Sequence, residues 1–219
     1  MAKNFYHSFH NILKYNYFYN IYKMSNIKLK GASDQTHIAQ KPIVPAFYLY
    51  WIIVSGPIII YECLYLLLRP DTMRDGDLFA YFQSFDTYVS IDPLFGEMDN
   101  WFVPVLIIFN ISEVALNFVG LILYKIIGTH KSQTIGAALL LFICVGSFYK
   151  TLIFLVYDFD YFRWEQNNTL NVVFVYILPN LCWIIFPFVG MLTIFRRMLL
   201  QNTQKQQTDT STINAKKTN

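Results

Sequence analysis

The sequence has 219 residues, of which 55% are hydrophobic, 18% are aromatic and only 14% are charged. A soluble domain of this length normally carries about a quarter charged residues. The composition therefore argues against a soluble domain, and the net charge of +3 gives no reason to expect nucleic-acid binding.

The first segment, residues 1–45, mixes lysines with tyrosines and phenylalanines, as in "NFYHSFHNILKYNYFYNIYK". Such a segment can lie along a membrane surface as an interfacial helix. A disordered N-terminal segment fits the composition equally well. We expect this segment to be cytosolic, and in part interfacial.

Four near-continuous apolar runs follow, over about residues 47–68, 101–124, 135–157 and 172–194. Each is long enough to cross a bilayer, which takes about 20 helical residues. In lipid, such a run has to be helical because its backbone groups find no water to bond. The sequence therefore predicts an all-α membrane protein, a four-transmembrane-helix bundle over residues 46–197. The three cysteines, Cys63, Cys144 and Cys182, lie apart within these runs, which argues against a disulfide framework or a metal site.

Charge is distributed unevenly between the connecting segments. Lysines predominate in residues 1–45, the short 125–131 link carries Lys125 and Lys131, and Arg196 and Arg197 open the tail, whereas residues 69–100 and 158–171 are acidic. Basic segments stay in the cytosol. This pattern predicts that both termini are cytosolic.

The tail, residues 198–219, is rich in Gln and Thr, and we expect it to be disordered. Lys216 and Lys217, the fourth and third residues from the end of the printed chain, resemble the dilysine retrieval signal of endoplasmic reticulum membrane proteins. The sequence therefore predicts a multi-pass protein of the endoplasmic reticulum membrane.

Polar side chains occur inside the apolar runs, where they are energetically expensive and by default mark function. They are Glu62, Asn110, Glu113, Asn117, Lys150 and Asn180. With a rise of about 1.5 Å per residue, antiparallel helices bring most of them, together with Trp183, to one layer. This convergence predicts a ligand pocket between the helices. The alternative is a structural ion pair of Lys150 with Glu62 or Glu113, plus asparagines bonded across helices. The two can coexist, since one pair leaves the second carboxyl free.

Four short stretches carry a family resemblance: "YVSIDPLF" at 88–95, "SEVALNF" with Glu113, "VGSFY" at 145–149, and "NLCWIIFP" with Asn180 and Trp183. In this order and membrane placement, over about residues 51–197, the chain resembles the EXPERA superfamily. Its branches include the emopamil-binding protein, a sterol delta8-delta7 isomerase, and the sigma-two receptor.

The resemblance implies a sterol or amphipathic-amine site inside the bundle. Glu62 and Glu113 would be the catalytic, proton-handling carboxyls. The ligand-binding residues would be Asn110, Asn117, Lys150, Asn180, Trp183, Tyr88 and Asp92. Besides the ligand, the predicted partners are membrane lipid and, as an open alternative, a second copy of the chain; no cofactor, metal or nucleic acid is expected.

Three functions remain open at this stage. The chain could be a sterol isomerase, a non-catalytic binder of sterols or cationic amphiphiles of the sigma-two receptor type, or a structural protein whose polar layer only fixes helix register. The isomerase branch carries a histidine one turn before its first-span glutamate. Ile58 and Ile59 stand in that region here, which argues against catalysis.

Overall fold

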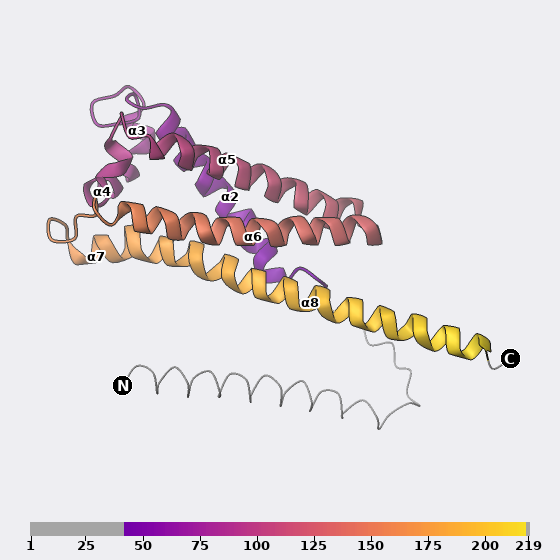
Figure 1. The fold of residues 1–219 in the computed structure, drawn as a ribbon. Coiled ribbons are helices and arrows are strands. Elements are labelled where there is room, and N and C mark those ends of the chain that lie inside the picture. The colour runs from indigo at the N-terminus through magenta and orange to yellow at the C-terminus, as the bar shows by residue number, and fades with distance from the viewer. Residues whose placement is uncertain (1–41, 218–219) are drawn as a thin grey trace, which may run out of the picture. The chain divides into compact units, whose positions relative to one another are not determined.

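The structure, a computed structural model, describes residues 42–217 (Figure 1). The predicted interfacial segment lies almost wholly outside this part of the chain. Within it, all regular elements are helical and no strand is present. In chain order they are α2 (Ala46–Leu67), α3 (Phe79–Phe82), α4 (Ser84–Ile91), η2 (Pro93–Gly96), α5 (Phe102–Leu121), η3 (Ile122–Ile127), α6 (His130–Asp158), α7 (Thr169–Asn171), η4 (Val172–Ile177) and α8 (Leu178–Lys217).

Four of the helical stretches are long and apolar enough to cross a membrane: Ala46–Leu67, Phe102–Ile127, His130–Asp158 and Thr169–Gln204. They coincide with the four predicted runs, so the prediction of an all-α protein with four candidate spans is confirmed. The third starts at His130, five residues before its apolar run, because the Thr129 side chain accepts a hydrogen bond from the Ser132 N–H. Such an N-cap starts a helix in polar sequence that hydropathy does not detect.

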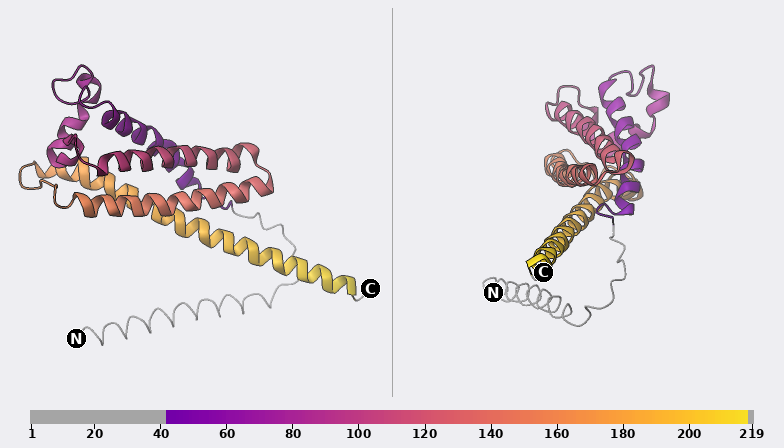
Figure 2. Two further views of the ribbon diagram at one scale, coloured as in Figure 1. Left: turned by 45° about the horizontal axis from the view of Figure 1, so that its top comes forward. Right: turned by 90° about the vertical axis from the view of Figure 1, so that its right-hand side faces the viewer.

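The four long helices form a closed ring of neighbours. α2 packs against α5 and α8, and α6 packs against the same two helices. Figures 1 and 2 show α5 and α6 side by side, with α2 passing behind them in the view of Figure 1. We call the end of the bundle that carries residues 68–101 and 159–168 the loop end. At the opposite end, Arg197 Nη1 donates to the carbonyl of Pro42 at 2.6 Å.

The apolar core is divided into two clusters along the bundle. One lies at the loop end and includes Ile59, Leu106 and Phe154; the other lies at the opposite end and includes Ile52 and Leu140. Between them, the buried positions of α5 are polar or glycine: Asn110, Glu113, Asn117 and Gly120. The predicted polar layer therefore separates two regions of ordinary apolar packing.

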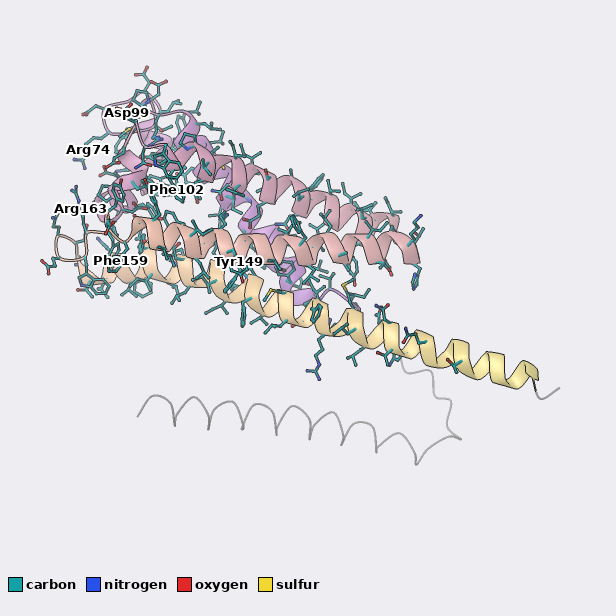
Figure 3. All side chains as sticks on the ribbon, viewed as in Figure 1. Arg74, Asp99, Phe102, Tyr149, Phe159 and Arg163 are labelled. Atoms are coloured by element: carbon teal, nitrogen blue, oxygen red, sulfur yellow. The ribbon has the colours of Figure 1, made fainter. Side chains whose placement is uncertain are left out.

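A short helical cap covers the loop end; we define it as residues 79–96, from α3 to η2. Arg69 Nη1 holds it from the end of α2 by donating to the Phe95 and Glu97 carbonyls at 2.9 and 2.8 Å. From the other loop, the Arg163 N–H donates to the Ile91 carbonyl at 2.9 Å. Figure 3 shows Arg74, Asp99 and Arg163 at this end, whereas Tyr149 lies midway along α6.

The last helix extends much further than the sequence predicted. α8 continues to Lys217, through residues that we expected to be disordered from 198 onwards. Neither proline nor glycine follows Gly190, so no residue interrupts the backbone ladder. Thr203 and Thr210 donate to carbonyls one turn back, Leu199 and Gln206, and their hydroxyls are thereby satisfied within the helix.

Helices α5 and α6 pack closely where Gly120 and Gly136 meet. A Cβ added to Gly136 would lie 2.8 Å from the Tyr124 nitrogen and 2.9 Å from the Gly120 carbonyl oxygen. Both are backbone atoms and neither can move without shifting a helix. Small residues at such contacts let transmembrane helices pack closely.

We therefore expect Gly136→Ala to lower the free energy of unfolding by about 1–3 kcal/mol, the range for overpacking. The matched control is Gly146→Ala on the same helix, where an added Cβ meets nothing within 4 Å. Thermal unfolding of both variants in detergent measures the difference. Equal melting temperatures would contradict close packing at Gly136.

Candidate functional site

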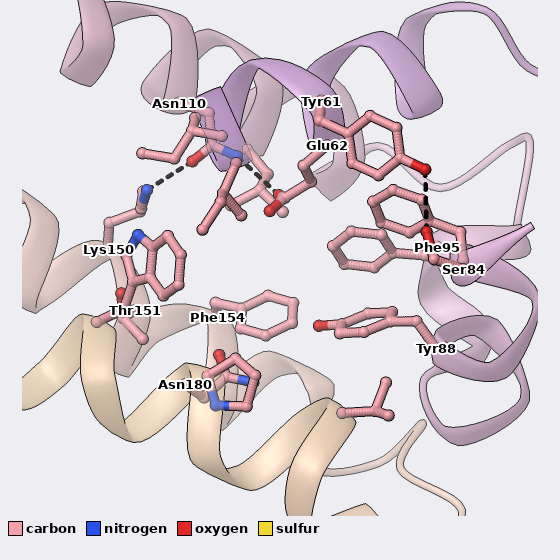
Figure 4. Close-up of a pocket in the computed structure, with 17 residues that line it drawn as sticks. Tyr61, Glu62, Ser84, Tyr88, Phe95, Asn110, Lys150, Thr151, Phe154 and Asn180 are labelled. Carbon is pink, nitrogen blue, oxygen red and sulfur yellow. Dashed lines mark hydrogen bonds between the residues drawn. The ribbon is translucent and has the colours of Figure 1, made fainter. Parts of the chain in front are cut away.

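A cavity of about 270 Å³ lies beneath the cap, between α2, α5, α6 and the start of the last helix (Figure 4). Its size is near the lower limit for small-molecule sites. The lining residues are Ile58, Ile59, Tyr61, Glu62, Ser84, Phe85, Tyr88, Phe95, Leu106, Asn110, Lys150, Thr151, Phe154, Val175, Pro179, Asn180 and Trp183. Most of this wall is apolar or aromatic, and its polar groups are concentrated at a few points.

One chain of hydrogen bonds links the polar groups of three helices. Lys150 Nζ donates to Glu113 Oε2 at 2.6 Å and to Asn110 Oδ1 at 2.5 Å. Asn110 Nδ2 in turn donates to Glu62 Oε1 at 2.8 Å, and Ser147 Oγ donates to Glu113 Oε1 at 2.9 Å. The Lys150–Glu113 ion pair is well buried, with 11% and 7% of the two side chains exposed.

The donor and acceptor roles in this row of hydrogen bonds follow from the chemistry of the side chains. An ammonium group only donates, so the Asn110 carbonyl has to face Lys150 and its amide has to face Glu62. Glu62 Oε1 is therefore an acceptor. Within residues 42–217 this is the one hydrogen bond assigned to the Glu62 carboxyl, and its second oxygen is left for whatever occupies the cavity.

The cavity brings together six of the nine residues singled out in the sequence: Glu62, Tyr88, Asn110, Lys150, Asn180 and Trp183. The other three lie elsewhere. Glu113 is buried against Lys150 and Ser147, and Asn117 is buried along α5 on the side away from the loop end. Asp92 is fully buried, accepts the Leu94 N–H, and does not line the wall.

Asn180 is held by its own helix. Its Nδ2 donates to the Tyr176 carbonyl at 2.9 Å, so its carbonyl oxygen faces the cavity that it lines. The preceding Pro179 has no N–H to bond the carbonyl four residues back, and the backbone just before it, Val172–Ile177, follows a π-helix. Such π segments occur frequently at functional sites.

Trp183 is supported by Trp51, which in turn stacks on Phe186, and the sequence pointed to neither of these two residues. The Trp51 ring meets the Trp183 ring edge-on at 4.9 Å and stacks on Phe186 at 4.6 Å. Aromatic pairs of this geometry contribute about 0.5–1.5 kcal/mol beyond their buried area. They bridge α2 and α8 and fix the indole that forms this part of the wall.

The cap supplies the remaining wall. Figure 4 shows the Tyr88 hydroxyl directed across the cavity toward Phe154, and Tyr61 bonded to Ser84, oxygen to oxygen, at 2.9 Å. Burial raises the pKa of the Tyr88 phenol well above its usual value. Its hydroxyl therefore stays protonated and can donate to a ligand. Sequence reasoning missed Tyr61 and Ser84 because a hydroxyl on an apolar surface carries no motif.

No protein-family model, curated protein or solved structure matches this chain. The resemblance to the EXPERA superfamily therefore stays a prediction. Within the described part of the chain, no three His, Cys, Asp or Glu side chains gather as a metal site would require.

The Lys150–Glu113 pair leads to a test by double-mutant cycle. Lys150→Met removes the cation and leaves Glu113 buried without its partner, which destabilises by about 3–5 kcal/mol in comparable pairs. Adding Glu113→Gln removes the stranded charge, so we expect the double variant to be more stable than Lys150→Met alone. Melting temperatures of the wild type, both single variants and the double variant measure the coupling. Additive effects would show that the two groups do not interact.

Proposed function

We propose that this chain is a membrane-embedded binding protein for an amphipathic amine, with a bulky apolar body of the sterol type and one positive charge. One observation carries the proposal. Glu62 lines an otherwise largely apolar cavity, and within the described residues its carboxyl accepts a single hydrogen bond, from Asn110.

Charge balance supports a cationic ligand. The two carboxyls Glu62 and Glu113, with Lys150, leave one net negative charge when all are ionised, and the salt bridge assigns Lys150 to Glu113. A buried charge without a partner is strongly unfavourable. One ammonium group beside Glu62 would complete the balance, and the Asn180 carbonyl would offer it a second acceptor.

The apolar wall suits the rest of such a ligand. Trp183, Tyr88 and Phe154 present aromatic rings to the cavity, and a cation over an aromatic face gains about 0.5–2 kcal/mol, most where water is excluded. Aliphatic groups from Ile58, Ile59 and Leu106 cover the remainder. These surfaces favour a rigid apolar body over a polar one.

A sterol isomerase is the second candidate. Glu62, Asn180 and Trp183 share the cavity, and by resemblance these positions serve a sterol isomerase. Moving a ring double bond requires one group that delivers a proton and another that removes one. The described wall has a single carboxyl and no histidine, and this is the reason why we propose binding first.

The cellular location and membrane orientation are part of the proposal as well. We place the protein in the endoplasmic reticulum membrane with both termini in the cytosol, on the basis of Lys216, Lys217 and the basic and acidic connecting segments. This orientation puts the cap on the lumenal side.

The binding function is tested with a tritiated steroidal amine and its uncharged hydroxyl analogue on the purified full chain. We expect Glu62→Gln to raise the Kd of the amine roughly 10- to 100-fold, the loss of one charge-assisted hydrogen bond. The Kd of the hydroxyl analogue should change little. Glu97→Gln, which removes a carboxyl bonded to Asn100 outside the cavity, is the matched control and should bind like the wild type. Unchanged amine binding by Glu62→Gln would refute the proposal.

The isomerase candidate is tested separately by expressing the chain in cells that lack their own sterol delta8-delta7 isomerase. Accumulation of delta7 sterols above the empty vector, lost in Glu62→Gln, would move the assignment to catalysis. Amine binding without conversion would leave the chain as a binder.

A further inference from the structure

Two carboxyl groups meet beneath the cap, outside the cavity described above. Asp92 follows α4 in the cap, and Asp158 is the last residue of α6. Both side chains are fully buried, at 0% exposure, and the two carboxyl groups lie close enough to interact directly. The contact therefore joins the cap directly to a membrane-crossing helix.

Only half of the carboxyl oxygens receive a donor from the surrounding chain. The Leu94 N–H donates to Asp92 Oδ1 at 3.0 Å, and the Tyr176 hydroxyl donates to Asp158 Oδ2. Asp92 Oδ2 and Asp158 Oδ1 are buried and receive no N–H or O–H from the described residues. Ionised carboxylates only accept hydrogen bonds, whereas a protonated carboxyl also donates. One proton placed between the two groups would satisfy both of these oxygens.

Within residues 42–217, no cation bonds to either carboxyl of the pair. Arg69, which holds the cap from the end of α2, donates its hydrogen bonds to backbone carbonyls. The titratable groups that face the pair are Tyr88 from α4, Tyr176 from η4 and Glu62 from α2. None of them is a cation. The ion pairs formed within residues 42–217 are Arg74–Asp86 and Lys150–Glu113, and Arg163, which bonds the cap through its backbone, has an exposed side chain.

We propose that Asp92 and Asp158 share one proton, that this proton fastens the cap to α6, and that its loss at alkaline pH releases the cap. With both carboxyls ionised, two negative charges would face each other in a buried site with no cation. Such a site relaxes by separating the charges or admitting water. The cap end that carries Asp92 is the element free to move, because α6 is fixed by α5 and α8.

Release of the cap would open the cavity. Ser84, Phe85, Tyr88 and Phe95 of its wall all belong to the cap. The shared proton would therefore make retention of any occupant sensitive to pH, whatever that occupant is. This inference does not depend on the proposed ligand, because the pair lies outside the cavity wall.

The acid–base behaviour of Asp92 agrees with the geometry. Burial and the neighbouring Asp158 carboxyl raise the pKa of Asp92 to about 10. A carboxyl with a raised pKa in the folded state stabilises the fold at acidic pH. That stability is lost as pH rises from the usual aspartate range toward the folded value.

The experiment measures the melting midpoint of the full chain in detergent from about pH 6 to about pH 9. We expect the wild-type midpoint to fall by roughly 3–5 °C per pH unit over this range. Asp92→Asn and Asp158→Asn each put a permanent amide donor where the proton would be, so their midpoints should be nearly independent of pH. Asp86→Asn, an exposed cap carboxyl paired with Arg74, is the matched control and should keep the wild-type slope. A flat wild-type profile, or wild-type slopes in both amide variants, would overturn the proposal.

A second measurement covers the case in which the variants fail to fold. Infrared spectra of the wild type labelled with ¹³C-carboxyl aspartate should contain, at neutral pH, the C=O band of a protonated carboxylic acid. The isotope separates aspartate from glutamate, so Glu62 and Glu113 cannot supply the shifted band. The band should disappear at alkaline pH together with the loss of stability. Its absence at neutral pH would exclude the shared proton.

Discussion

The buried ion pair between Lys150 and Glu113 determines the arrangement of the remaining polar groups. A charge placed among apolar helices needs a partner with good geometry, and this pair has one at 2.6 Å. The partners come from α6 and α5, so the pair also fixes the position of one helix against the other. Lys150 donates a second hydrogen bond to the Asn110 side chain, and Asn110 in turn donates one to Glu62 on α2.

This row of bonds explains why the cavity lies on the loop side of the layer. Toward the opposite end, Tyr48, Leu140 and Cys144 pack with Gly190 into an ordinary apolar core. Toward the loop end, Glu62 borders the cavity, and the backbone before Pro179 is a π segment. Space remains there, and the cap closes it with aromatic rings.

The helices and the polar layer could be predicted because both depend on quantities that sequence gives directly. Apolar length predicts a membrane span, and helical rise places Glu62, Asn110, Glu113 and Lys150 at similar depth. Rotation about each helix axis is not fixed by depth. Whether Lys150 pairs with Glu62 or with Glu113 therefore had to remain open until the helix packing was known.

Other parts of the site depend on contacts between segments far apart in sequence. Trp51 supports Trp183 across 132 positions of the chain, and no local pattern indicates this. Asp92 was expected at the ligand because of its loop motif, yet it caps η2. Asp158 ends an apolar run and resembles a loop residue in the sequence. Its role depends on the fold, which brings Asp92 and Tyr176 to it.

The four carboxyls inside the bundle can be compared by the groups that bond to each of them. Glu113 has the Lys150 ammonium and the Ser147 hydroxyl. Asp92 and Asp158 have each other, with Leu94 and Tyr176 as outer donors, and one proton would complete their bonding. Glu62 has a single amide donor and borders the cavity. The described chain thus places a cation beside Glu113 and a second carboxyl beside each of Asp92 and Asp158, whereas Glu62, which borders the cavity, has only the Asn110 amide. A positively charged ligand, as proposed above, would supply Glu62 with the cation that Lys150 supplies to Glu113.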